Sequence, residues 1–187
     1  MISTQLEKLQ FTVTQYHKMN EAGILTEDDR VELIRGEILK MSPVGKRHAA
    51  CVDFISNFLY AALASKVIVR VQNPIILNDL SEPQPDISLV KFRTDFYRSG
   101  LPQTKDILLL IEVADSTIDY DRDVKIPLYA ENGILEVWLI DIKAETITIY
   151  RQPTPTGYKD VKILQRGDSL SILAFPEINL TLNDIFG

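Results

Sequence analysis

Two acidic residues, Asp86 and Glu112, stand out because each lies in or beside an apolar run typical of a β-strand. Asp86 follows Pro85 at the start of PDISLV, and Glu112 interrupts DILLLIEV over residues 106–113. If the two strands are neighbours, we expect both carboxylates to meet at one edge of the sheet. Carboxylates about 4 Å apart repel each other by about 4 kcal/mol at an effective dielectric constant of about 20. Such a pair must take up a proton or a cation.

Magnesium suits a site of this kind, because Mg²⁺ uses one or two carboxylates and completes its shell with water and substrate phosphate. Mn²⁺ is the alternative ion. The chemistry is then metal-assisted hydrolysis of a phosphodiester, in which the ion polarises the phosphate and lowers the pKa of an attacking water. The structural alternative is that each acid forms a turn at a strand end or pairs with a nearby arginine. Both interpretations of Asp86 and Glu112 stay open on spacing alone.

Lys125 is a third candidate for the site. It lies four residues after Asp121 and four before Tyr129, on one stripe of a predicted helix. Asp121 and Lys125 also have the i,i+4 spacing of an ordinary ion pair on a helix surface. However, the helix follows the Glu112 strand after a short turn, so its first turns can lie over the carboxylates. From there a lysine would orient water or stabilise charge on the phosphate.

The elements that must position these residues begin with a short helix and a hairpin. Thr12 and Gln15 have the spacing of a capping box, which predicts a helix that ends near Gly23. The segment RVELIRGEILKM alternates on both sides of Arg35 and Gly36, which predicts a β-hairpin. This pair of elements reads as an appendage to the main fold.

A second helix is predicted to begin near Lys46. His48, Val52, Ile55 and Leu59 recur with helical spacing on one face, which places His48 at the inward-facing start of this helix. Apolar runs then predict a series of strands at residues 67–77, 85–90, 106–113, 134–141, 145–151 and 158–164. The strand at 106–113 is apolar on both faces and is therefore expected to be central.

A third helix is predicted from Ile118 to Glu131, with Pro127 expected to cause a kink or a late start. The carboxy-terminal segment INLTLNDIF predicts a closing strand or a short helix. The order of elements predicts an α/β fold, in which helices flank a mixed β-sheet, with an N-terminal helix and hairpin and extra C-terminal strands. No repeat or linker divides the chain, so we expect a single domain over residues 1–187.

The composition is that of an ordinary globular protein, with 45% apolar and 25% charged residues. Cys51 is the only cysteine, which excludes an intramolecular disulfide. No apolar stretch approaches the roughly 20 residues of a membrane helix, so we expect a cytoplasmic protein with no membrane partner. The net charge of −6 disfavours strong binding to nucleic acid. Acidic residues gather in the centre, and basic residues around 35–47, 91–105 and 159–166.

Short motifs in the chain are similar to those of known nucleases. PD at 85–86 and IEV at 111–113, with a displaced lysine in the next helix, are similar to the PD-(D/E)XK nuclease superfamily. Longer segments carry a closer likeness, and they are, in chain order, DDRVELIRGEILKMSPVGKRHA, VQNPIIL, SEPQPDISLV, LLIEVADSTIDYDRDVKIPLYAENGILEVWLID and YRQPTPTGY. Together they resemble the Uma-two family of restriction-endonuclease-like proteins, over about residues 10–165.

The resemblance implies a restriction-endonuclease-like core and a magnesium-dependent endonuclease that acts on DNA, expected to be double-stranded, as a homodimer. It implies that Asp86 and Glu112 bind the metal and that Lys125 replaces the lysine missing at Ala114. It also suggests that Glu32 and His48 complete the site.

Alternatives remain for the last two residues. One is that Glu32 faces solvent in the hairpin, and the other is that His48 caps the helix or packs in the core.

Two functions follow from these features. The first is a DNA endonuclease with an Asp, Glu and Lys site. The second is a catalytically inactive module for binding or assembly that retains the nuclease fold, which the acidic charge and Ala114 favour. The position of the Lys125 ammonium separates them, because an ammonium within about 5 Å of the carboxylates is coupled to them.

Overall fold

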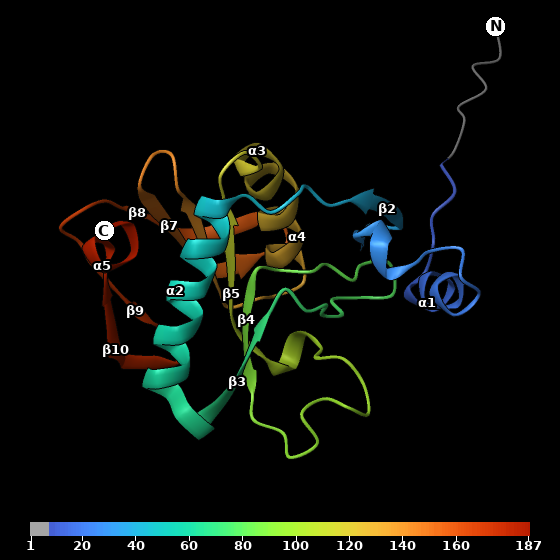
Figure 1. The fold of residues 1–187 in the computed structure, drawn as a ribbon, viewed down its shortest axis with the longest axis horizontal. Helices are drawn as coiled ribbons and strands as arrows, with labels where there is room; N and C mark the ends of the chain where they lie inside the picture. Colours follow the sequence, from blue (N-terminus) through green and yellow to red (C-terminus); the bar gives the residue numbers. More distant parts are fainter. Residues whose placement is uncertain (1–7) are drawn as a thin grey trace, which may run out of the picture.

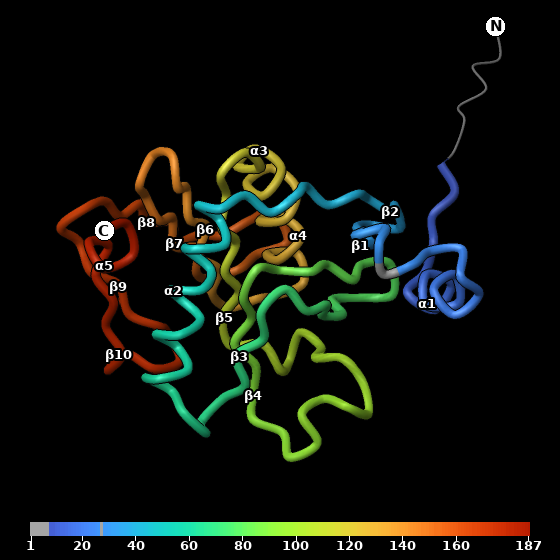
Figure 2. The backbone as a smooth tube through the Cα atoms, in the orientation of Figure 1, coloured from blue at the N-terminus to red at the C-terminus, as the bar shows by residue number. Residues whose placement is uncertain are grey.

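A mixed six-stranded sheet forms the centre of the protein. The computed structural model describes residues 8–187 (Figures 1 and 2). The strand order is β3-β4-β5-β6-β7-β8, and every neighbouring pair is antiparallel except β5 and β6. The strands are β3 (Val67–Val71), β4 (Ile87–Lys91), β5 (Ile107–Ala114), β6 (Glu136–Asp141), β7 (Thr146–Thr154) and β8 (Gly157–Leu164). The predicted mixed α/β sheet is therefore confirmed.

Helix α2 (Lys46–Leu63) covers one face of this sheet (Figure 1). Its apolar stripe, which includes Ile55, Leu59 and Leu63, is fully buried against inward-facing residues of the strands. The same core contains apolar side chains from the end of the chain. That end folds into β9 (Ser169–Ile172), β10 (Phe175–Thr181) and α5 (Leu182–Phe186).

A second helical segment covers the opposite face of the sheet. It consists of α3 (Ile118–Tyr120), a π-helical turn η4 (Asp121–Lys125) and α4 (Ile126–Glu131), which follow one another without a break. Beneath it lies a second apolar cluster, which includes Leu110 and Ala114. Ile111 and Val113 point the other way, into the core under α2. Strand β5 is thus covered on both faces, as its sequence predicts.

The amino-terminal appendage packs beside the sheet. Helix α1 (Val13–Glu21) begins at Thr12, whose capping box with Gln15 is present. Strands β1 (Val31–Ile34) and β2 (Glu37–Lys40) form the predicted hairpin, because Arg35 and Gly36 both adopt the positive φ of a tight two-residue turn. Leu33 is hydrogen-bonded to the chain just before β4, so the hairpin is held at the same end of the sheet as Asp86.

Two sequence-based expectations about strands need correction. The strand predicted over 67–77 ends at Val71, because Gln72 has a positive φ of 48° and Pro74 follows soon after. Strand β9 was not predicted, since its four residues give too short a pattern. The carboxy-terminal segment forms both a strand and a helix rather than one of them.

Three short 3₁₀ turns complete the fold, namely η1 (Glu27–Asp29), η2 (Ala64–Lys66) and η3 (Thr104–Asp106).

Within residues 8–187, no helix is both long and apolar enough to cross a membrane.

Candidate active site

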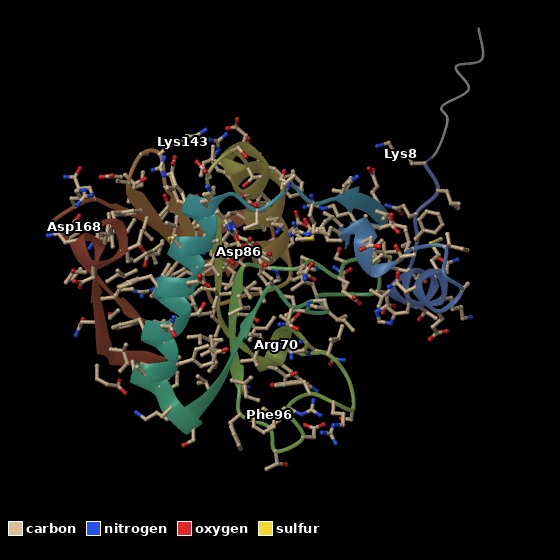
Figure 3. All side chains as sticks on the ribbon, viewed as in Figure 1. Lys8, Arg70, Asp86, Phe96, Lys143 and Asp168 are labelled. Carbon is tan, nitrogen blue, oxygen red and sulfur yellow. The ribbon has the colours of Figure 1, made fainter. Side chains whose placement is uncertain are left out.

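The antiparallel pairing of β4 with β5 brings Asp86 and Glu112 to the same end of the sheet. Ile87 lies opposite Ile111, so Asp86, one residue before β4, reaches the part of β5 that carries Glu112. The Asp86 carboxylate accepts a hydrogen bond from the Val113 N–H at 2.8 Å. Figure 3 labels Asp86 near the middle of the molecule, close to the start of α2. The fold thus brings Asp86 and Glu112 close together, as expected from the sequence.

Glu112 points to the face of the sheet that the second helical segment covers. Its side chain alternates with those of Ile111 and Val113, and it is 2% exposed. Oε1 accepts a hydrogen bond from the Tyr129 hydroxyl at 2.5 Å. Burial raises the pKa of Glu112 well above its usual range, whereas the Lys125 ammonium opposes this shift.

Lys125 reaches Glu112 from the helix above it. The Nζ atom lies 3.3 Å from Glu112 Oε2 and 3.4 Å from Glu32 Oε2, and the side chain is buried. Burial by itself lowers the pKa of Lys125, but the carboxylates of Glu112 and Glu32 outweigh it and raise the pKa above its usual value. Lys125 is therefore a buried ammonium shared between two carboxylates.

The helix over Glu112 reaches its position through the π-helical turn. The Ile126 N–H bonds to the Asp121 carbonyl, five residues earlier, and Pro127 follows with no N–H of its own. A proline removes an intrahelical hydrogen bond, and a π-turn is one way for a helix to continue past that loss. The expected irregularity at Pro127 is present as this turn, and the turn ends at Lys125.

Glu32 enters the site from β1 of the hairpin. It is 3% exposed, so the alternative that it faces solvent is wrong. Oε1 accepts a hydrogen bond from the Tyr120 hydroxyl at 3.0 Å, and Oε2 accepts one from the Gln84 N–H at 3.0 Å. These two donors hold the carboxylate beside Lys125, although Glu32 is far from both in the sequence.

His48 lies in the first turn of α2, where the sequence places it. Its Nε2 is 3.0 Å from Asp86 Oδ1. The hydrogen bond to Asp86 raises the pKa of His48 above its usual value, although partial burial lowers it. His48 therefore contacts the site through Asp86 and does not pack in the core.

Asp121 is a member of the site that the sequence did not identify. The alternative that Asp121 and Lys125 form an ion pair on a helix surface is wrong, since both side chains are buried. Asp121 accepts a hydrogen bond from the Thr117 hydroxyl at 2.7 Å. Burial raises its pKa to about 6, with Lys125 opposing the shift. The available signal was an aspartate four residues before Lys125, but an ion pair on a helix surface has the same spacing.

These residues line one cleft of about 390 Å³. Its walls come from β1 and β2, the loop before α2, the end of β5 and the first turns of the second helical segment. All five residues expected from the sequence lie along it, namely Glu32, His48, Asp86, Glu112 and Lys125. The structure thus brings together every residue of the predicted site.

The cleft is rich in carboxylate groups, which divalent cations bind. The carboxyl groups that line the cleft outnumber its lysines and arginines, so a further cation is electrostatically favoured; they are Glu32, Asp86, Glu112, Asp115 and Asp121, against Arg30, Lys40 and Lys125. Over residues 8–187, no group of three or more His, Cys, Asp or Glu side chains is arranged to hold a metal ion. Mg²⁺ needs only one or two protein carboxylates, with water in its remaining positions. Asp86 and Glu112 offer carboxylate oxygens, which are the kind of donor that such an ion takes.

Comparison with protein families gives one match that spans most of the chain. Residues 13–183 match the model of the Uma2 family, which is described as "Putative restriction endonuclease". The chain belongs to the Uma2 family. The resemblance seen in the sequence is thereby confirmed, and all the cleft residues discussed above fall within the matched range.

A solved structure shares the fold of this chain. It is the crystal structure of "a putative nuclease belonging to DUF820" from Anabaena variabilis, with a TM-score of 0.74. The match covers 94% of this chain and 97% of that one, at 17% sequence identity. Identity this low supports the fold alone. No protein in the curated set matches the chain.

Proposed function

We propose that this Uma2 protein is a magnesium- or manganese-dependent endonuclease that hydrolyses phosphodiester bonds in double-stranded DNA. The observation that carries the proposal is the position of the Lys125 ammonium, 3.3 Å from the Glu112 carboxylate. The site therefore has an acid pair and a lysine, even though Ala114 occupies the usual lysine position. Family membership supports a nuclease, and the carboxylate-rich cleft supports a metal-dependent one.

Each residue has a definite part in the proposed reaction. Asp86 and Glu112 would hold the divalent ion, which when bound polarises the phosphate and lowers the pKa of an attacking water. Lys125 would donate a hydrogen bond to a phosphate oxygen and stabilise the negative charge that develops there as the water attacks phosphorus and the sugar oxygen leaves.

Other residues would keep these groups in place. Glu32 holds the Lys125 ammonium together with Glu112. Tyr129 fixes Glu112, and His48 fixes Asp86. Preorganised groups of this kind lower the reorganisation that the reaction would otherwise require.

Cleavage of supercoiled plasmid with Mg²⁺ or Mn²⁺ tests the proposal. We expect Asp86→Asn, Glu112→Gln and Lys125→Met each to lose at least about 100-fold in rate, as is typical when a charge-stabilising group is removed. Asp53→Asn is the matched control, because Asp53 is an exposed carboxylate on α2 outside the cleft. Melting temperatures of all variants separate a loss of chemistry from a loss of fold.

Equal rates in the wild type and in all three site variants would identify the activity as contamination and overturn the assignment. A second readout is calorimetric titration with Mn²⁺, in which Asp86→Asn and Glu112→Gln weaken binding whereas Asp53→Asn does not.

The second candidate function is a binding or assembly module with no cleavage activity. The observation that favours it is that the described part of the chain has no arrangement of three metal-ligating side chains. It predicts a folded protein that cleaves no DNA with either ion and that binds Mn²⁺ no better than Asp86→Asn does.

A duplex has two strands, so we further propose that two copies of the chain act on it together, as the family resemblance implies.

A further inference from the structure

Strand β8 forms an open edge of the central sheet. β7 occupies one side of it, and among residues 8–187 no strand pairs with the other side. Residues 159–163 are exposed, and two of them are apolar: Val161 is 50% exposed and Ile163 is 69% exposed. An edge strand presents N–H and C=O groups that another strand can pair with, and apolar side chains strengthen that contact.

The charges of β8 favour antiparallel pairing with a second copy of itself. When two copies pair about Val161, Asp160 of each copy faces Lys162 of the other, which gives two opposite-charge pairs on one face. On the other face, Val161 meets its counterpart and Ile163 meets the aliphatic stem of Lys159. Opposite charges directly across two antiparallel strands stabilise the pairing.

The neighbouring registers lack this complementarity. Pairing about Asp160 places that carboxylate opposite its own counterpart, and pairing about Lys162 does the same with two ammonium groups. Like charges directly opposite each other destabilise paired strands. Residues directly opposite each other in an antiparallel pair point to the same side of the sheet. Because side chains alternate along a strand, the twofold axis that relates two identical strands must pass through a residue position and not between two residues. The register about Val161 is therefore the favourable one of these three.

The charge of Asp160 is available for such a partner. Its neighbour in the sheet is Arg151, but the Arg151 guanidinium binds the buried carboxylate of Glu136 and the Ser171 carbonyl. Asp160 thus faces outward beside an arginine that is already engaged. A lone charge on an edge strand normally opposes pairing, whereas alternating charges of opposite sign specify one partner.

We propose that β8 is a self-association surface, on which a second copy of this chain pairs antiparallel about Val161 and joins two six-stranded sheets into one. This names the contact surface of the proposed homodimer. No residue of β8 lines the cleft, so the surface stands or falls separately from the nuclease chemistry. One strand pair buries less than the roughly 1,200 Å² of a standard interface, so the dimer dissociates readily on dilution.

Charge reversal tests the register. Sedimentation from about 1 μM to about 1 mM, a range that covers weak association, is expected to show the wild type rising from 21.2 kDa toward twice that mass. Asp160→Lys and Lys162→Asp each replace two opposite-charge pairs by two like-charge pairs. We expect either change to weaken the dimer about tenfold or more. Asp53→Lys makes the same charge change on α2 and is expected to have no effect.

Two rescue experiments make the test specific. An equal mixture of the Asp160→Lys and Lys162→Asp proteins has opposite charges at both positions across the contact, so a heterodimer is expected. The double variant with both changes exchanges the charges and is expected to dimerise as the wild type does. A wild type that stays monomeric at all concentrations, a dimer that both single variants preserve, or a failure of both rescues would each overturn the proposal.

Discussion

Lys125 reaches Glu112 from a helix, whereas the PD-(D/E)XK pattern has its lysine two residues after the glutamate. Ala114 points to the same face of β5 as Glu112 and packs in the apolar cluster under the helix. The helix lies directly over that face, so its buried lysine reaches Glu112 from above. What the chemistry requires is the position of the ammonium, and more than one place in the sequence can supply it.

The burial of single residues was the least predictable part of the site. Glu32, Asp121 and Lys125 have polar side chains whose spacing is also typical of exposed positions, yet all three are buried. A charged side chain is buried when partners compensate the loss of water. Those partners come from segments far apart in the chain, such as Tyr120 for Glu32, and no local pattern reveals them.

Asp121 makes a pH-dependent contribution to stability. Its pKa is raised from 3.8 to about 6 by burial, so the folded state binds this proton more tightly than the unfolded state. The resulting stabilisation is complete below about pH 4 and is lost as the pH rises through about 6. Asp121→Asn cannot ionise and does not lose this contribution. As the pH rises through this range, we expect its free energy of unfolding to increase by about 3 kcal/mol relative to that of the wild type.

Urea unfolding of both proteins from pH 4 to pH 7 measures this difference. Thr117→Val is a useful control, because it removes the hydrogen bond to Asp121 while leaving the carboxyl group in place. If the difference in free energy of unfolding between Asp121→Asn and the wild type does not change with pH, the burial of an ionisable Asp121 is contradicted.

At the level of elements, the hairpin β1–β2 and the second helical segment decide the geometry of the site. The hairpin was predictable from alternation around Arg35 and Gly36, and so was a helix over residues 118–131. The π-helical turn was not, because Pro127 indicates an irregularity without specifying its form. That form matters, since it determines which residues of the helix face Glu112.

Gly36 is the residue on which the hairpin depends. It has a φ of +79°, and a Cβ atom at this position would lie 2.6 Å from Gln10 Cβ. We expect Gly36→Ala to destabilise the protein by about 1–3 kcal/mol, because an L-residue is strained there and must displace Gln10. Since Glu32 sits on the same hairpin, the cleavage rate is expected to fall as well.

Thermal unfolding and plasmid cleavage measure both effects. Gly100→Ala is the matched control, since Gly100 has no positive φ and its added Cβ meets no atom within 4 Å. If the two variants melt at the same temperature, the turn does not constrain the hairpin in the way described.

For the molecule as a whole, the basic regions of the sequence do not all surround the site. Lys91 lies at the opposite end of β4 from Asp86, and the loop that follows it projects away from the sheet in Figure 2. Figure 3 labels Phe96 of that loop far from Asp86. The cations that line the cleft are instead Arg30 and Lys40, beside and within the hairpin.

We therefore expect only a shallow salt dependence of DNA binding, with Arg30 as one of its sources. Each phosphate contact contributes about 0.9 to the slope of log K against log salt. Arg30→Gln is expected to reduce the slope by about that amount, and Arg98→Gln, an exposed arginine of the far loop, to leave it unchanged. Anisotropy of a labelled duplex with EDTA present measures both, and equal slopes for the two variants would refute this placement of the DNA.

The sequence by itself determined most of the elements, the central position of β5 and the family, and it made Asp86 and Glu112 candidates for one site. These depend on local signals: hydrophobic period, turn residues and short motifs. Only the tertiary structure decided that Lys125 is buried between Glu32 and Glu112, that Asp121 joins them and that the far basic loop does not. The physical reason is that burial and charge compensation depend on which segments meet in space, and those segments are distant in the chain.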